Sequence, residues 1–176
     1  MIIKEHYING NPIEFRTAFF SEDEKYRYLL EIVWDPSRPI LTTIGLNPSK
    51  ATHLVNDNTI SKCIKFARDR GFGGYRMLNA FAYRSTKPAV LFSDPDPVGP
   101  ENTIEFFRRW RTETTVACWG ATMRSKLWKY RYWGHEIAEA LPGLLCFKYT
   151  SKGRDPEHPL YLPLHSDLNL VQFSYE

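Results

Sequence analysis

The chain has 176 residues, of which 43% are hydrophobic and 15% aromatic, so it can bury one sizeable core. We expect a single α/β domain over residues 1–176, with its core in residues 25–165. The formal net charge of +3 permits nucleic-acid binding without requiring it. No apolar run of about eighteen residues is present, and the N-terminus lacks the apolar stretch of a secretory signal. The sequence therefore predicts a cytoplasmic protein that does not enter a membrane.

In chain order, the first predicted elements are two strands and a helix. Residues 26–33 are rich in β-branched and aromatic side chains and predict a strand, which we place at a sheet edge. A proline-containing turn separates it from residues 40–44, which predict a buried strand. A helix follows, capped at its start by Asp57 or Asn58 and ending before Gly71.

The second half of the chain predicts three more strands and two helical regions. The strands lie at residues 75–81, 114–118 and 144–149, each an apolar run bounded by turn residues. A long proline-rich loop follows the first of them. Helices are predicted from residue 100 to residue 110, with proline in the first turn, and in segments over residues 122–141.

This alternation of strands and helices predicts a three-layer α/β/α sandwich with a mainly parallel central sheet of four to five strands. In such sheets, ligands bind beyond the carboxyl ends of the strands. Four loops are expected to meet there, at residues 45–49, 79–88, 119–124 and 150–159.

Cys63, Cys118 and Cys146 are widely spaced and include no C-x-x-C pair. They indicate neither a disulfide framework nor a zinc or iron-sulfur site, so we expect buried, reduced thiols and no metal or other cofactor. Asp94 and Asp96 neighbour prolines and are interpreted as turn residues.

Three residues in the predicted loops are candidates for chemistry. Gly45 and Pro48 would hold the Asn47 amide at a defined angle above the sheet, where it can orient water or a polar ligand; the alternative is an ordinary Asn-Pro-Ser turn. Asn79 offers a donor and an acceptor that could read a base edge, or it bonds its own turn. His158 is a candidate hydrogen-bond donor or acid/base group, or a structural histidine.

Basic residues in the same loops could surround a phosphate-bearing ligand, although each alone is a common surface cation. They are Arg84, Lys87, Lys152 and Arg154. The chain has no G-x-G-x-x-G, G-x-x-x-x-G-K-[ST], G-x-S-x-G or H-E-x-x-H motif. Dinucleotide, triphosphate, α/β-hydrolase and zinc-protease functions therefore lack their usual motifs.

Several motifs together resemble the bacterial and phage family named domain of unknown function 1643, over residues 25–165. They are Gly45-Leu46-Asn47-Pro48-Ser49, Asp57-Asn58-Thr59-Ile60, Gly71-Phe72-Gly73-Gly74, Asn79-Ala80-Phe81-Ala82, Asp96-Pro97-Val98-Gly99-Pro100-Glu101-Asn102, Trp119-Gly120 and His158-Pro159-Leu160-Tyr161-Leu162. The family name implies no activity. Asn58 replaces a proline that is usual in that family.

The strand-end motifs also resemble, more distantly, those of the uracil-DNA glycosylase superfamily. This resemblance implies that Asn47 positions the attacking water, that Asn79 reads the base edge and that His158 steadies charge on the departing base. It further implies base-binding and phosphate-binding roles for neighbouring residues. The base-binding candidates are Gly45, Leu46, Pro48 and Phe81, and the phosphate candidates include Ser49 and Gly120.

The chain departs from that superfamily at two places. Leu160 stands where a serine is expected, and the aromatic residue that should stack on the base is not identified. Phe66, Phe72 and Phe81 are candidates for stacking, with core packing as the alternative for each.

These motifs favour a DNA glycosylase-like hydrolase that cleaves the N-glycosidic bond of a damaged or modified base by water attack. A non-catalytic module that binds a base, nucleotide or nucleic acid in the same cleft is an alternative, and so is an enzyme acting on free nucleosides or nucleotides. The expected partners are DNA or a small-molecule base or nucleotide. The sequence leaves the base, DNA against RNA, and the oligomeric state open.

Overall fold

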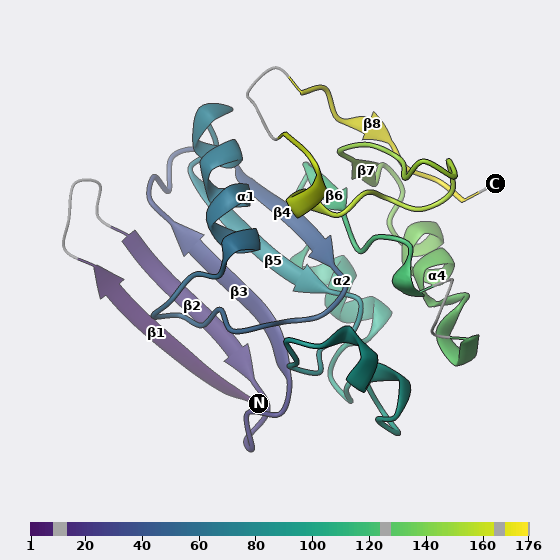
Figure 1. The fold of residues 1–176 in the computed structure, drawn as a ribbon. Helices are drawn as coiled ribbons and strands as arrows, with labels where there is room; N and C mark the ends of the chain where they lie inside the picture. The colour runs from purple at the N-terminus through teal and green to yellow at the C-terminus, as the bar shows by residue number, and fades with distance from the viewer. Residues whose placement is uncertain (9–13, 124–127, 164–167, 176) are drawn as a thin grey trace.

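The computed structural model describes residues 1–8, 14–123, 128–163 and 168–175, and its centre is an eight-stranded sheet (Figure 1). The strand order across the sheet is β1-β2-β3-β5-β4-β6-β7-β8. The strands are β1 (Ile2–Ile8), β2 (Glu14–Phe20), β3 (Arg27–Val33), β4 (Ile40–Gly45), β5 (Gly74–Asn79), β6 (Thr115–Ala117), β7 (Leu145–Cys146) and β8 (Val171–Gln172).

The sheet is mixed, and not mainly parallel as expected. Strands β5, β4, β6 and β7 run parallel, whereas β1, β2 and β3 form an antiparallel group on one side and β8 pairs antiparallel with β7 on the other. The prediction that residues 26–33 form an edge strand is wrong, because β2 pairs along the outer side of β3. The apolar residues Ala18 and Phe20 of β2 are almost fully buried, and their burial holds the β1–β2 hairpin on the sheet.

Helices lie on both faces of this sheet. Helix α1 (Asn58–Asp69) covers one face, where Ile60, Cys63 and Phe66 pack on side chains of β3, β4 and β5. Helices α2 (Ile104–Trp110) and α4 (Trp133–Ala140) pack on the other face. Three 3-10 helices complete the described helical elements: η1 (Pro88–Phe92), η2 (Trp128–Tyr130) and η3 (Pro159–Tyr161).

Helix boundaries follow their caps. The Asp57 side chain accepts a hydrogen bond from the Ile60 amide at 2.9 Å, which confirms Asp57 as the residue that starts α1. The helix predicted from residue 100 begins instead at Ile104, because the Thr103 hydroxyl caps the Phe106 amide. Of the helical segments predicted over residues 122–141, α4 is the main one, and residues 124–127 lie outside the described residues.

Three of the four remaining predicted strands are present, and the last is shorter than predicted. The strands predicted at residues 40–44, 75–81 and 114–118 are present as β4, β5 and β6, whereas only Leu145 and Cys146 of the last predicted strand pair as β7. The three cysteines are free and buried, as expected. Within the described residues, no helix is long and apolar enough to cross a membrane.

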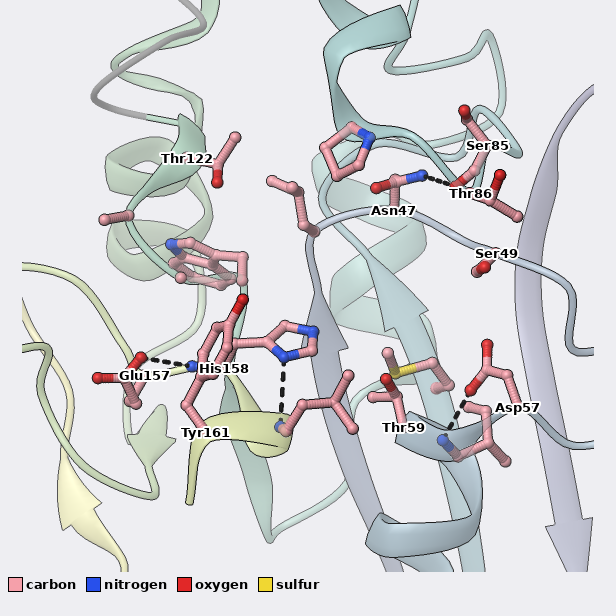
Figure 2. A pocket seen from close by; sticks show the side chains of 18 of the residues that line it. Asn47, Ser49, Asp57, Thr59, Ser85, Thr86, Thr122, Glu157, His158 and Tyr161 are labelled. Atoms are coloured by element: carbon pink, nitrogen blue, oxygen red, sulfur yellow. Dashed lines mark hydrogen bonds between the residues drawn. The ribbon is translucent and has the colours of Figure 1, made fainter.

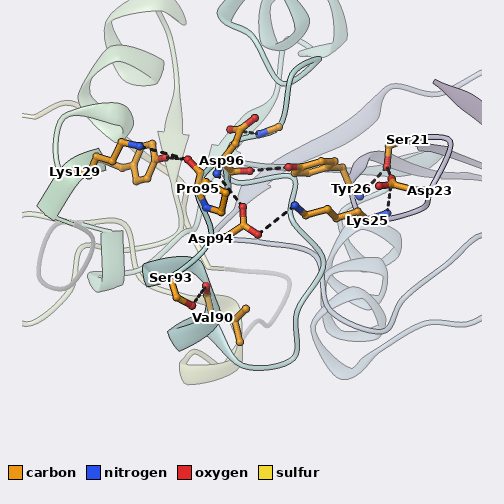
Figure 3. A network of polar contacts seen from close by, with 12 residues as sticks. Ser21, Asp23, Lys25, Tyr26, Val90, Ser93, Asp94, Pro95, Asp96 and Lys129 are labelled. Atoms are coloured by element: carbon orange, nitrogen blue, oxygen red, sulfur yellow. Dashed lines mark hydrogen bonds and ion pairs between the residues drawn. The ribbon is translucent and has the colours of Figure 1, made fainter.

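The proline-rich loop after β5 is anchored by polar contacts to the turn between β2 and β3 (Figure 3). The Lys25 ammonium lies 3.3 Å from Asp94, and the Tyr26 hydroxyl donates to the Asp96 carbonyl at 2.9 Å. Both aspartates also accept hydrogen bonds from nearby loop amides, as turn residues do. These contacts hold the loop in place at the carboxyl end of β5.

Candidate functional site

A cavity of about 650 Å³ opens beyond the carboxyl ends of the parallel strands (Figure 2). This volume lies within the range of about 300–1,000 Å³ that is typical of small-molecule sites. Its walls come from the loops after β4, β6 and β7, from the first turn of α1 and from the start of the proline-rich loop. The lining residues include Arg27, Leu46, Asn47, Ser49, Asp57, Thr59, Met77, Ser85, Trp119, Gly120, Glu157, His158 and Tyr161.

Asn47 lies in the loop directly after β4, and its amide nitrogen is fixed by backbone acceptors. Nδ2 donates to the carbonyl oxygens of Ser85 at 2.8 Å and Pro48 at 3.0 Å. Oδ1 has no hydrogen-bond partner among the described residues, and Figure 2 shows it pointing away from Ser85. The side chain therefore supports the turn and also presents a rigidly held acceptor at the cavity wall, which can orient a water molecule.

His158 lines the same cavity from the loop that follows β7. Its Nδ1 accepts the Leu160 amide at 3.3 Å and so caps η3, which leaves the proton of the neutral ring on Nε2. Burial lowers the pKa of His158 below its ordinary value of 6.5, because the charged ring loses hydration, while Glu157 and Asp57 act in the opposite direction. Burial thus favours the neutral imidazole, and its Nε2 donor has no hydrogen-bond partner among the described residues.

Gly120 follows β6 and brings the main chain close to His158. Its φ of +70° lies in the left-handed region that favours glycine, and its amide donates to the Pro156 carbonyl at 2.9 Å. A Cβ at this position would lie 3.7 Å from His158 Cβ. The glycine therefore lets the loops after β6 and β7 meet at the cavity.

Asn79 ends β5 beside Gly45 but does not line the cavity. The residue is fully buried, and neither atom of its amide has a hydrogen-bond partner among the described residues. A Cβ built on Gly45 would lie 3.2 Å from Asn79 Oδ1 and 2.5 Å from Met77 Cε. Met77 does line the cavity, so its thioether lies close both to the cavity and to the Asn79 amide.

The aromatic residues that were candidates for stacking do not line the cavity. Phe81 is fully buried on the α2 and α4 face, with its ring 5.4 Å from Tyr130, and Phe66 packs on Phe147. Among the described residues, the aromatic rings at the cavity are Trp119 and Tyr161. Tyr161 is 79% exposed, so it stands at the mouth.

The predicted basic residues also lie outside this cavity. Arg84 borders a second, more open depression, where it donates to the Glu24 carbonyl at 2.9 Å. Lys87, Lys152 and Arg154 are exposed. Of the two other phosphate candidates, Ser49 lines both hollows and Gly120 lines the main cavity. Leu46 lines the main cavity as well, whereas Gly45 and Pro48 support it from within the fold.

Sequence reasoning missed Arg27, the first residue of β3, whose side chain lines the cavity although the residue is only 1% exposed. The available signal was an arginine within the apolar run of residues 26–33. Asp57 and Thr59 were noted only for the start of a helix or within a motif, yet both line the cavity. Among the described residues, no cluster of three or more His, Cys, Asp or Glu side chains could hold a metal ion.

Comparison with known proteins gives one family match. A family model described as a protein of unknown function (DUF1643) matches residues 27–160. No curated protein and no solved structure matches the chain. The match begins at Arg27 and includes every strand and helix from β3 to β7, and therefore most of the cavity wall.

Proposed function

Since the chain belongs to the DUF1643 family, whose description names no activity, we propose from the cavity itself that it hydrolyses the N-glycosidic bond of a damaged or modified base in DNA. The observation that carries this proposal is that Asn47 and His158, 111 positions apart in sequence order on the loops after β4 and β7, line one cavity. We also propose that the fold is a three-layer α/β/α sandwich of the uracil-DNA glycosylase type.

In this mechanism Asn47 orients the attacking water. A carboxamide is a weak base, so it acts by position: its Oδ1 accepts a hydrogen bond from the water and directs a lone pair of the water oxygen toward the sugar carbon. The two backbone bonds of Nδ2 keep this acceptor in place before the substrate arrives. The water loses its proton as the bond to the base breaks, and that proton passes to the medium or to the departing base.

His158 stabilises the departing base. As the glycosidic bond breaks, electrons move onto the base, and a neutral imidazole with its proton on Nε2 can donate to the oxygen or nitrogen that becomes negative. A neutral donor is suited to this role because it keeps its proton through the step. The depressed pKa of His158 favours that form near neutral pH.

Asn79 and Tyr161 complete the recognition of an extruded base. Movement of the Met77 thioether would open the cavity to the Asn79 amide, whose donor and acceptor could then bond the base edge. Tyr161 at the mouth can stack on a base, which is worth about 1–3 kcal/mol. Such contacts offset the cost of extrusion, a few kcal/mol.

The test is incubation with oligonucleotides that carry a panel of damaged and modified bases. Abasic sites are detected by alkaline strand cleavage, and released bases by mass spectrometry. We expect release of at least one base, and a loss of about 100-fold or more in Asn47→Ala and His158→Gln, because each removes a transition-state contact.

Two exposed residues outside the cavity provide matched controls, Asn169→Ala and His6→Gln. Both should retain wild-type release. If wild type releases no base from the panel but still binds the oligonucleotides, the protein is a binding module. Tight binding of free nucleotides with little dependence on salt would instead indicate a nucleotide enzyme, because DNA binding weakens steeply as salt rises.

A further inference from the structure

Arg27 is a buried cation without the carboxylate partner that the buried Arg16 and the half-buried Arg76 have. Arg16 and Arg76 pair with Glu14 and Glu31. Arg27 instead donates from Nη1 to the Ala51 carbonyl at 2.5 Å, and it forms no ion pair with a carboxylate in the described part of the chain. Its Nε has no hydrogen-bond partner among the described residues.

This guanidinium carries its charge at neutral pH. Burial lowers the pKa of Arg27 to about 10, which still leaves it protonated. Asp57 favours the charged form from nearby, but its carboxylate accepts the Ile60 amide at the start of α1. A buried charge that is not paired is unfavourable, so an anion in the cavity would be bound with little competition.

The cavity that Arg27 lines has further groups that suit an oxyanion. Ser49 and Thr59 line it with hydroxyl groups, and Thr59 belongs to the first turn of the twelve-residue helix α1, whose N-terminus carries partial positive charge. Two carboxylates, Asp57 and Glu157, also line the cavity. A phosphate has more acceptor oxygens than a carboxylate, so it can accept bonds from a guanidinium and from hydroxyl groups at the same time.

We propose that Arg27 binds a phosphate group, so that the ligand of this cavity is a phosphorylated nucleotide unit and not a bare nucleoside or base. The nucleotide part of this inference rests on the proposed function. The phosphate part concerns recognition alone and can be measured without turnover.

Calorimetric titration tests whether Arg27 binds a phosphate group. The probes are inorganic phosphate, deoxynucleosides, deoxynucleoside 5′-monophosphates and short single-stranded DNA. Wild type should bind a monophosphate at least tenfold more tightly than the matching nucleoside. Arg27→Gln should weaken the binding of the monophosphate about 10- to 100-fold, because a charge-assisted hydrogen bond is lost. It should leave the affinity for the nucleoside unchanged. Asp57→Asn should raise the affinity for the monophosphate, because it keeps a side chain that caps α1 and removes a negative charge that repels the phosphate.

Arg16→Gln is the matched control, since it removes a buried arginine that does not line the cavity. It should leave monophosphate binding unchanged. If Arg27→Gln does not fold, Arg27→Lys and Asp57→Asn test the proposal instead. Arg27→Lys should still bind the monophosphate more tightly than the nucleoside, by a smaller factor than wild type. An unchanged affinity of Asp57→Asn for the monophosphate would overturn the proposal.

Three results separate this inference from the proposed function. Equal binding of nucleoside and monophosphate by wild type refutes the role of Arg27 whatever the enzyme does. Inorganic phosphate binding as tightly as a nucleotide refutes the nucleotide part. Arg27-dependent monophosphate binding without base release from any oligonucleotide refutes the glycosylase and leaves the phosphate site standing.

Discussion

Asn47 and His158 each use one polar atom to build the fold and leave another without a hydrogen-bond partner in the described part of the chain. The amide nitrogen of Asn47 bonds two carbonyl groups, and Nδ1 of His158 caps η3. A role in the fold and a role in ligand binding are therefore compatible at both residues. At the scale of single residues, backbone acceptors and donors in the surrounding loops set the orientation of these two side chains.

The neutral state of His158 predicts a pH dependence of stability. Its folded pKa lies below the ordinary value of 6.5, so between the two values the unfolded chain binds more protons, and stability rises with pH. The contribution is present above about pH 6.5 and is lost as the pH falls toward the folded pKa. Urea unfolding from pH 5 to 8 should show this loss in wild type and a smaller loss in His158→Gln.

His53→Gln is a second variant for that series: burial also lowers the pKa of His53, so this substitution should remove a separate part of the same loss. A double variant should lose both contributions. Parallel curves for wild type and His158→Gln would show that His158 titrates alike in the folded and unfolded chain.

At the scale of elements, α1 links the fold to the cavity. Its cap, Asp57, is also a cavity residue, so the same carboxylate fixes the start of the helix and influences the charge of Arg27. Its apolar face, including Ile60 and Phe66, is buried against the sheet. The position of the first turn is thus determined by packing and by one side-chain hydrogen bond.

Loss of the hydrogen bond between the Asp57 side chain and the Ile60 amide should destabilise the folded chain without unfolding it. We expect Asp57→Ala to lower the free energy of unfolding by about 1 kcal/mol, because one amide of the first turn loses its acceptor. Asp57→Asn should stay close to wild type, since asparagine caps as well as aspartate. Chemical unfolding monitored by circular dichroism measures both, and equal losses in the two variants would contradict the capping role.

At the scale of the whole molecule, the β1–β2 hairpin extends the sheet beyond the family match. The match starts at Arg27, whereas β2 pairs with β3 along Phe15–Phe20 and buries Ala18, Phe19 and Phe20. Without the hairpin, β3 would become an edge strand with an uncovered apolar surface.

A chain that lacks residues 1–20 should therefore aggregate or unfold. Burial of three apolar side chains is worth several kcal/mol, a large part of the stability of a small domain. Size-exclusion chromatography and thermal unfolding measure the outcome against the full chain. A monomeric, cooperatively folded truncation would show that the hairpin is dispensable.

Local patterns in the sequence were sufficient for most elements of the region 26–118. Strands β3, β4, β5 and β6 and the capped start of α1 follow from apolar runs and punctuating residues, because these features act over a few neighbouring positions. The same patterns indicated the loops that carry Asn47 and His158, because the carboxyl ends of parallel strands meet at one edge.

Tertiary structure alone decided the rest. The antiparallel hairpin, the burial of Asn79 and the exposure of Lys87 depend on which distant segments pack together, and no local period encodes that. Arg27 is the clearest case: within its strand it is one polar residue among apolar ones, and only the loop after β4 and the helix beyond it make it the buried cation of a cavity. Its role arises from desolvation, which is a property of the assembled fold.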